Sequence, residues 1–264
     1  MKLICSFSSL AVVLLVGSVF AEDPNTPLPA PRVIVPVAMY DSAGVGGDGP
    51  RLLEETFAAK TEFRITRITA EEIRAGKLKG YKALIVPGGL SQTQGNTLGE
   101  DGRDMIRAFV REGNSYVGIC AGCYLASSHY KWSLGILPVK VVDSANWGRG
   151  IGDLRMELTS DGKEWLTRKE STAKVHYHNG PVLEPIKDSK EKLIPLALYK
   201  EEMTRKGAKE GLMKETPAIA AARYGKGWAV GISPHPEQSE GLQGFVPSAL
   251  RFTLNHPLPN ETKN

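Results

Sequence analysis

Short apolar runs alternate with segments of helical periodicity through the first half of the chain, and no other feature of the sequence constrains its fold as strongly. The runs have the length and composition of buried parallel strands. Strands separated by helices imply an α/β fold with a doubly wound, mostly parallel sheet in a single domain. The expected strands are 33–39, 63–68, 83–86 and 115–119, and the expected helices are 51–60, 70–75 and 102–111.

The second half of the chain is less regular. The charged stretch 200–214 is expected to be exposed, and residues 239–254 are expected to form a last helix. Sheets of this class bind ligands at the carboxyl ends of their strands, where Gly89 and Cys120 both fall. Further strands are expected at 139–142, 155–159, 174–177, 218–223 and 228–232.

The N-terminal segment has the pattern of a signal peptide. Lys2 supplies a positive charge, residues 10–16 are an unbroken apolar run, and Ala21 precedes an acidic pair. We expect residues 1–21 to be cleaved and the protein to be exported to a periplasmic or extracellular space, with no membrane span left. An uncleaved anchor is the alternative, although the apolar run is short for a span of about 20 residues.

Composition sets the remaining boundaries. The prolines of residues 22–31 predict an extended linker, residues 32–256 the folded domain, and the polar residues 257–264 a loose tail. The 33 Lys and Arg residues are mixed with 29 Asp and Glu residues along the chain. Neither a nucleic acid nor an anionic membrane surface is therefore expected as a partner.

The cysteines require a chemical interpretation. Of three in the chain, only Cys120 and Cys123 lie outside the signal segment, too few for a disulfide scaffold. Cys120 stands in the frame Gly118-Ile119-Cys120-Ala121-Gly122, between an expected strand and a helix. A sharp strand-to-helix turn needs glycines because its backbone is strained and its neighbours crowd closely.

Such a turn exposes the thiol at the N-terminus of a helix, whose partial positive charge favours the thiolate. We therefore interpret Cys120 as a nucleophile. The backbone N–H groups of Ala121 and of Gly89 or Leu90 are expected to form an oxyanion hole. A buried structural cysteine on a glycine-rich turn is the plain alternative.

A second motif, Ser233-Pro234-His235-Pro236-Glu237, follows an apolar strand. A cysteine nucleophile needs a base that accepts its proton and later protonates the leaving amine. The base in turn needs an acceptor that fixes its tautomer. His235 and Glu237, two apart on a constrained loop, can supply both.

These motifs resemble the class I glutamine amidotransferase superfamily and, within it, the biotin-protein ligase N-terminal-like family. That family has an opening strand before a glycine-rich loop, an apolar strand ending in Pro-Gly-Gly, and a Gly-Ile-Cys-Ala-Gly-x-Tyr elbow. The corresponding segments here are 33–49, 84–89 and 118–124. The resemblance covers about 32–136 and reaches the His235 loop by motif only, and it implies a flavodoxin-like fold.

Carried over to this chain, the resemblance implies Cys120 as nucleophile, His235 as base, Glu237 as its orienting partner and Gly89 as an oxyanion-hole donor. The implied substrate is a small carboxamide or related carbonyl compound, and no cofactor is expected. The chain has no room for a ligase or synthetase domain. Any ammonia acceptor would therefore lie on a separate protein.

Cys123 departs from the family pattern, in which a small apolar residue is expected. It completes a C-x-x-C with Cys120, the spacing of thiol–disulfide oxidoreductases, so a redox protein is a second hypothesis. That hypothesis leaves the His235 loop unexplained. Two roles for Cys123 stay open: it forms a disulfide with Cys120 that silences the nucleophile, or it is a packing residue.

A third hypothesis for the function is a non-catalytic ligand-binding domain that has kept the pocket.

Four further residues are candidates to line that pocket: Tyr40, Trp147, Tyr177 and His178. His176 and His178 are two apart, so on a strand both imidazoles would face one side. H-x-H can bind zinc, but no third ligand is evident nearby, and we expect no metal site. Trp147 lies in the glycine-containing loop 146–150, a candidate lid.

Overall fold

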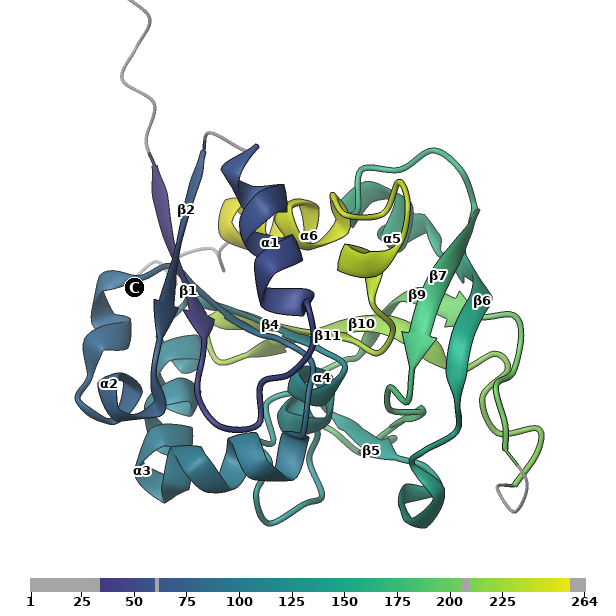
Figure 1. The fold of residues 1–264 in the computed structure, drawn as a ribbon, viewed down its shortest axis with the longest axis horizontal. Helices are drawn as coiled ribbons and strands as arrows, with labels where there is room; N and C mark the ends of the chain where they lie inside the picture. The colour runs from purple at the N-terminus through teal and green to yellow at the C-terminus, as the bar shows by residue number, and fades with distance from the viewer. Residues whose placement is uncertain (1–33, 60–61, 206–208, 257–264) are drawn as a thin grey trace, which may run out of the picture. The chain divides into compact units, whose positions relative to one another are not determined.

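A nine-stranded sheet forms the centre of the computed structural model, which describes residues 34–59, 62–205 and 209–256 (Figure 1). In order across the sheet, the strands are β2 (Phe63–Ile68), β1 (Val35–Tyr40), β3 (Ala83–Val86), β4 (Ser115–Ile119), β11 (Gly227–Ile232), β10 (Pro217–Tyr224), β9 (Ile194–Tyr199), β6 (Ile151–Leu158) and β7 (Thr172–His178). The strands from β2 to β11 run parallel. Each later step, from β11 to β7, is antiparallel.

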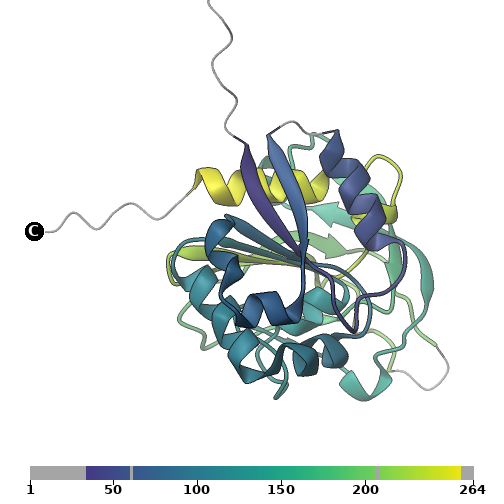
Figure 2. The same cartoon turned by 60° about the vertical axis from the view of Figure 1, so that its left-hand side comes forward.

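Helices cover both faces of this sheet (Figures 1 and 2). One face packs against α1 (Gly49–Ala58), α5 (Ser160–Trp165) and α6 (Phe245–Asn255). The other packs against α2 (Ala70–Arg74), α3 (Ser91–Arg111) and α4 (Ala121–Ala126). The α/β class, the parallel core and the single domain are confirmed, whereas the antiparallel extension beyond β11 was not predicted.

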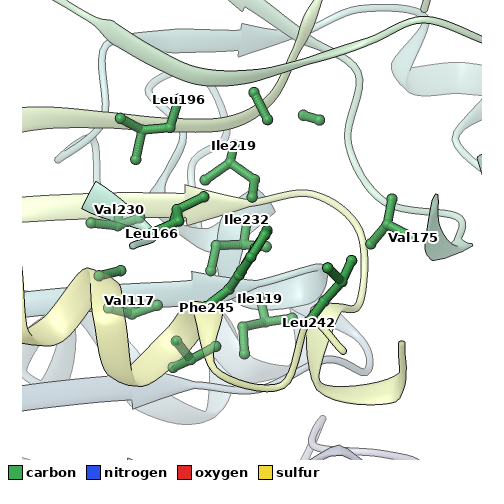
Figure 3. Close-up of a cluster of buried hydrophobic side chains, with 14 of the residues drawn as sticks. Val117, Ile119, Leu166, Val175, Leu196, Ile219, Val230, Ile232, Leu242 and Phe245 are labelled. Carbon is green, nitrogen blue, oxygen red and sulfur yellow. The ribbon is translucent and has the colours of Figure 1, made fainter. Parts of the chain in front are cut away.

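Each face has its own apolar core. Figure 3 shows part of the first, in which Phe245 and Leu242 pack against strand residues such as Ile119 and Ile232. Because β3, β4 and β11 are covered on both sides, every one of their residues is buried. This double covering explains why these strands read as continuous apolar runs rather than as alternating ones.

Local signals set two of the helix starts. Pro50 lies in the first turn of α1, where its missing N–H has no helical partner to lose. Thr69 precedes α2 and accepts the Glu72 N–H at 3.2 Å, while the Glu72 carboxylate accepts the Thr69 N–H at 2.9 Å. This capping box satisfies two helix-end donors at once.

The predicted starts of two other helices were wrong. α3 begins at Ser91 rather than at residue 102, and Gly99 kinks it with a φ of 65°. Arg103 bridges the kink, because its guanidinium donates to the Gly95 carbonyl at 2.8 Å. α6 begins at Phe245 rather than at residue 239, after the short helix η3 (Pro236–Gln238) and a turn at Gly241, whose φ is 72°.

The middle of the chain differs most from the predictions. The expected strands at 155–159 and 174–177 are parts of the longer antiparallel pair β6 and β7. The strand expected at 139–142 is β5 (Val139–Val141), which pairs with β8 (Leu183–Pro185) in a separate two-stranded sheet. α5, β8 and β9 were not predicted. The stretch expected to be exposed is partly folded inward, since Met213 is fully buried.

In the described part of the chain, no helix is both long enough and apolar enough to cross a membrane. The expected signal peptide (1–21), linker (22–31) and polar tail (257–264) lie outside the described residues.

Candidate active site

Cys120 joins β4 to α4, and the backbone there packs so closely that the neighbouring residues must be small. Its φ is 50°, a region that residues with a side chain rarely adopt. A Cβ added to Gly118 would lie 2.3 Å from the Gly122 carbonyl oxygen, and one added to Gly122 would lie 2.1 Å from the Val86 oxygen. Both glycines of the frame are therefore required by the close approach of the backbone.

The Pro87-Gly88-Gly89 turn follows β3, which lies beside β4 and parallel to it. Gly89 and Cys120 consequently share the carboxyl edge of the sheet, as expected. Gly89 has a φ of 136°, and a Cβ there would lie 2.0 Å from the Gly44 oxygen. The glycine-rich loop after β1 thus packs directly on this turn.

His235 reaches the same edge from β11, the other neighbour of β4. Its Nδ1 lies 2.7 Å from Glu237 Oε1, and both side chains are almost fully buried. A Cβ added to Gly88 would lie 2.9 Å from His235 Cε1 and 3.7 Å from Cys120 Cβ. The bare backbone at Gly88 therefore lets the imidazole and the cysteine lie together, and the structure brings all three predicted triad residues to one place.

The charges around His235 favour its protonated form. Burial alone would lower the pKa of His235, but hydrogen bonds with Cys120 and Glu237 and electrostatic interactions with the same two residues outweigh burial and raise this pKa to about 10. A Cβ added to Gly49, the first residue of α1, would lie 3.5 Å from Glu237 Oε1. The first turn of α1 therefore lies directly against the Glu237 carboxylate.

The predicted oxyanion-hole donors differ in availability. The N–H of Leu90 donates to the Gly44 carbonyl at 2.7 Å and is committed to the loop. Within the described residues, the N–H groups of Gly89 and Ala121 have no hydrogen-bond partner. The N–H groups of Gly89 and Ala121 are thus the two predicted donors that are free to donate hydrogen bonds to a developing oxyanion.

Residues outside the sequence motifs hold the His235 loop in place. The His235 N–H donates to the His176 carbonyl at 2.8 Å, which fixes the loop to the edge strand β7. The Ser239 hydroxyl donates to the His235 carbonyl at 2.6 Å and accepts the His176 N–H at 2.9 Å. Since Nδ1 of His235 gives its hydrogen to Glu237, the Gln238 amino group has Glu237 Oε1, at 3.3 Å, as its acceptor. Nothing in the sequence around Ser239 or Gln238 signals these contacts.

The turn after β7 lies directly over the thiol. The Cys120 thiol donates to the His178 carbonyl at 3.4 Å, and the Tyr124 hydroxyl donates to the next carbonyl, that of Asn179, at 3.3 Å. Asn179 has a φ of 52°, and its side-chain oxygen accepts the Gly150 N–H at 2.8 Å. The Asn179-Gly180 pair marks this turn in the sequence, although no role was assigned to the Asn179 side chain itself.

The pocket candidates are divided by the fold. His178 lies at the thiol, and Tyr177 is buried in the core cluster that includes Cys120, with its hydroxyl donating to the Gly180 carbonyl at 2.8 Å. Tyr40 is instead buried in the cluster on the other face, where burial raises its pKa to about 12. Trp147 is 52% exposed, and no contact among the described residues joins it to Cys120.

The loop 146–150 is fixed rather than poised as a lid. Arg149 is only 2% exposed and pairs with Asp143 at 3.1 Å and with Glu202 at 3.2 Å. Two surface hollows of about 390 and 310 Å³ are lined by residues other than the predicted site residues. The described residues hold no cluster of side chains suited to a metal ion.

Cys123 points away from this site. It is fully buried in the core cluster on the opposite face from that of Cys120. Its sulfur would lie 2.8 Å from a Cβ added to Gly231, so it fills the space over that glycine. Burial raises the pKa of the Cys123 thiol, and both cysteines are free. The geometry supports a packing role for Cys123.

Residues 37–148 match the family model described as biotin-protein ligase, N terminal. The match spans the opening strand, the Pro-Gly-Gly turn and the Cys120 elbow, and it confirms the resemblance read from the sequence. No curated protein matches the chain.

Solved structures share the fold at low sequence identity. A ThuA-like protein from Bacteroides uniformis is 15% identical with a TM-score of 0.60, over 90% of this chain and 97% of that one. A ThuA-like protein from Parabacteroides merdae is 9% identical with a TM-score of 0.57, over 84% and 90% of the two chains. A β-galactosidase from Bacillus circulans sp. alkalophilus is 15% identical with a TM-score of 0.52, over 83% of this chain but 31% of the enzyme. These likenesses show a shared flavodoxin-like fold.

Proposed function

We propose that this chain, whose residues 37–148 match the biotin-protein ligase N-terminal family, is a cysteine-dependent amidohydrolase or amidotransferase-like enzyme. Cys120 is the nucleophile, His235 the base and Glu237 its orienting partner. The observation that carries the proposal is the buried 2.7 Å contact of His235 with Glu237, placed beside Cys120 over the bare backbone of Gly88.

The geometry supports a two-step acyl transfer. The Cys120 thiolate attacks the carbonyl carbon of a carboxamide, and a sulfur–carbon bond forms. The π-electron pair of the carbonyl bond moves onto the oxygen, and the resulting oxyanion accepts hydrogen bonds from the N–H groups of Gly89 and Ala121. The protonated His235 gives its proton to the leaving nitrogen as the carbon–nitrogen bond breaks. Ammonia or an amine departs, and a thioester stays on Cys120.

Water completes the cycle in the hydrolytic case. His235, now neutral, takes a proton from the attacking water, and the hydroxide adds to the thioester carbon. The carbon–sulfur bond then breaks, which releases a carboxylic acid and restores the thiolate and the imidazolium.

The surroundings of the thiol favour a small substrate. Cys120 is only 7% exposed, and the His178 carbonyl lies against its sulfur. A bulky carbonyl compound would have to displace the turn that carries His178 and Asn179. This crowding supports a small carboxamide or a related carbonyl compound as the substrate.

Ammonia release from a panel of small carboxamides tests the proposal with matched thiol variants. The intact protein is expected to turn over at least one member, and Cys120→Ser to lose activity by roughly a thousandfold or more. Cys123→Ser is expected to stay within about threefold of the parent, since Cys123 only fills space. Equal loss in the two variants would favour a redox pair, and full activity in Cys120→Ser would refute the nucleophile.

Export is part of the same proposal. It is motivated by the charged, apolar and small-residue pattern of residues 1–21. N-terminal sequencing of the protein recovered outside the cytoplasm should begin at Glu22. A chain that starts at Met1 in that fraction would instead support an uncleaved anchor.

A further inference from the structure

Two further imidazoles, those of His176 and His178, lie near that of His235, and the three differ in how they are held. His235 pairs with Glu237 at 2.7 Å, and His176 Nδ1 lies 3.4 Å from Asp153 Oδ1. The imidazole of His178 has no hydrogen-bond or ion-pair partner among the described residues, so both of its nitrogens are available to a ligand. The ring centres of His176 and His178 lie 6.2 and 6.3 Å from that of His235.

The position of His178 follows from the strand register. Val175 and Tyr177 point into the core, so His178 stands on the outer face of β7 and is exposed. Its own carbonyl accepts the Cys120 thiol at 3.4 Å, which makes it the residue that covers the nucleophile. Directly opposite on β6 is Ile151, which is 58% exposed. The residue whose carbonyl covers the thiol therefore carries an exposed imidazole beside an apolar side chain.

Charged and titratable groups face His178 from every element around it. The imidazolium of His235 supplies a positive charge, and its carboxylate partner Glu237 is buried. Asp153, which lies opposite His176 on β6, also forms an ion pair with Lys174 at 3.4 Å. Burial, followed by the charges of His235 and His176, lowers the pKa of His178 from its usual value near 6.5. The titratable groups on the elements packed around it are Cys120 and Tyr124 from α4, His176 from β7, Asp153 from β6, and His235 and Glu237 from the loop after β11.

We propose that His178 sets the charge selectivity of the thiol centre. In its neutral form it admits uncharged ligands such as carboxamides, and in its protonated form it adds a positive charge that attracts ligands bearing a carboxylate. The inference rests on the proposed function, because it takes Cys120 as the reacting group. It makes His178 a specificity residue that touches the ligand, distinct from the His235–Glu237 pair.

Two alkylating probes measure this selectivity directly. Iodoacetamide is an uncharged carboxamide and iodoacetate its anionic counterpart, which stays ionised above about pH 5 because such carboxyl groups titrate near 3.5. With each probe the thiolate forms a sulfur–carbon bond and iodide leaves. The ratio of the two rates therefore cancels the thiolate fraction and reports the local charge.

The expected result is a rise in the iodoacetate-to-iodoacetamide ratio at Cys120 as the pH falls from 7.5 to 5. A unit charge near the carboxylate of the probe, partly screened by solvent, gives roughly a threefold to tenfold change. His178→Gln and His178→Asn should flatten the ratio to within about twofold, whereas the matched control His176→Gln should keep the rise. Rates are followed in a Cys123→Ser background on the peptide that contains Cys120, because both cysteines otherwise share that peptide.

A flat ratio in the parent protein, or an unchanged rise in both His178 variants, overturns the proposal. Failure of the proposed function is visible separately in the same data. In that case the iodoacetamide rate at Cys120 would match that of a free thiol and would not depend on His235. The parent profile alone stays decisive if either variant is poorly folded.

Discussion

The elbow region, residues 83–126, and the segment 139–214 are held in place by different means. In the elbow, the contacts are made by backbone against bare backbone, as where Gly122 meets the Val86 carbonyl. The later segment has such approaches too, since a Cβ on Gly162 would lie 1.8 Å from the Leu196 oxygen, but there a buried arginine also joins distant parts of the chain. Arg149 is 2% exposed and pairs with the carboxylate of Asp143, 6 residues away, and with that of Glu202, 53 residues away.

This difference decides what can be read from the sequence and how the site is built. Backbone approach leaves a local signature, because only glycine fits, whereas the partner of a buried arginine can lie anywhere in the chain. The site draws on both regions. Cys120 comes from the elbow, while the His235 loop is fixed to β7 of the later segment through the His176 carbonyl.

Among the predicted substitutions, Gly122→Ala in the elbow is expected to destabilise the fold most. The added Cβ would lie 2.1 Å from the Val86 oxygen, and neither backbone can move without displacing β3 or α4. We expect a loss of about 4 kcal/mol in the free energy of unfolding, measured by urea denaturation. Gly80→Ala is the control, since nothing lies within 4 Å of a Cβ there, and it should cost less than about 1 kcal/mol. Equal losses in the two variants would show that close approach does not hold the elbow.

Arg149→Met tests the later segment in the same way. Removing the guanidinium leaves Asp143 and Glu202 mostly buried without their cation, so unfolding should become easier by about 3 kcal/mol. The control is Arg155→Met, whose side chain is 58% exposed and 3.8 Å from Glu201, and it should cost less than about 0.5 kcal/mol. A loss at Arg149 no larger than at Arg155 would mean that other contacts hold this segment.

The pH dependence of stability tests the contacts through which His235 connects the two regions. The pKa of His235 is raised to about 10 in the folded state, so its contribution is complete below its unfolded value near 6.5 and is lost as the pH rises towards 10. Between pH 7 and 10 the parent should therefore lose on the order of 2 kcal/mol of stability relative to His235→Gln. Parallel stability curves for the two proteins would contradict a charged His235 in the folded state.

The comparison also explains which predictions from sequence held. The strands 63–68, 83–86 and 115–119 were predicted residue for residue. The last two are covered on both faces and are unbroken apolar runs between turn signals, whereas the first is an edge strand with exposed Arg64 and Arg67. The elbow and the Pro-Gly-Gly turn were predicted to share an edge, and they do. His235 and Glu237 were placed beside Cys120 from a motif more than a hundred residues away.

Other parts of the fold had no local signal. The start of α3 was missed because residues 91–101 are polar and contain two glycines, and Arg103 compensates from the next turn by donating to the Gly95 carbonyl. Tyr40 was expected at the pocket but faces the other core, since the face of a buried strand residue cannot be read from an all-apolar run. Asn179 and Ser239 act through contacts that only the folded chain creates.

The triad itself is tested most directly by the alkylation rate of Cys120 with iodoacetamide at pH 7, in the parent and in His235→Ala. Both proteins carry Cys123→Ser, so that Cys120 is the cysteine labelled in the peptide 112–131, and the urea transition of each protein shows that it is folded. If His235 accepts the thiol proton, the variant should react at least about tenfold more slowly. Equal rates in two folded proteins would contradict the account.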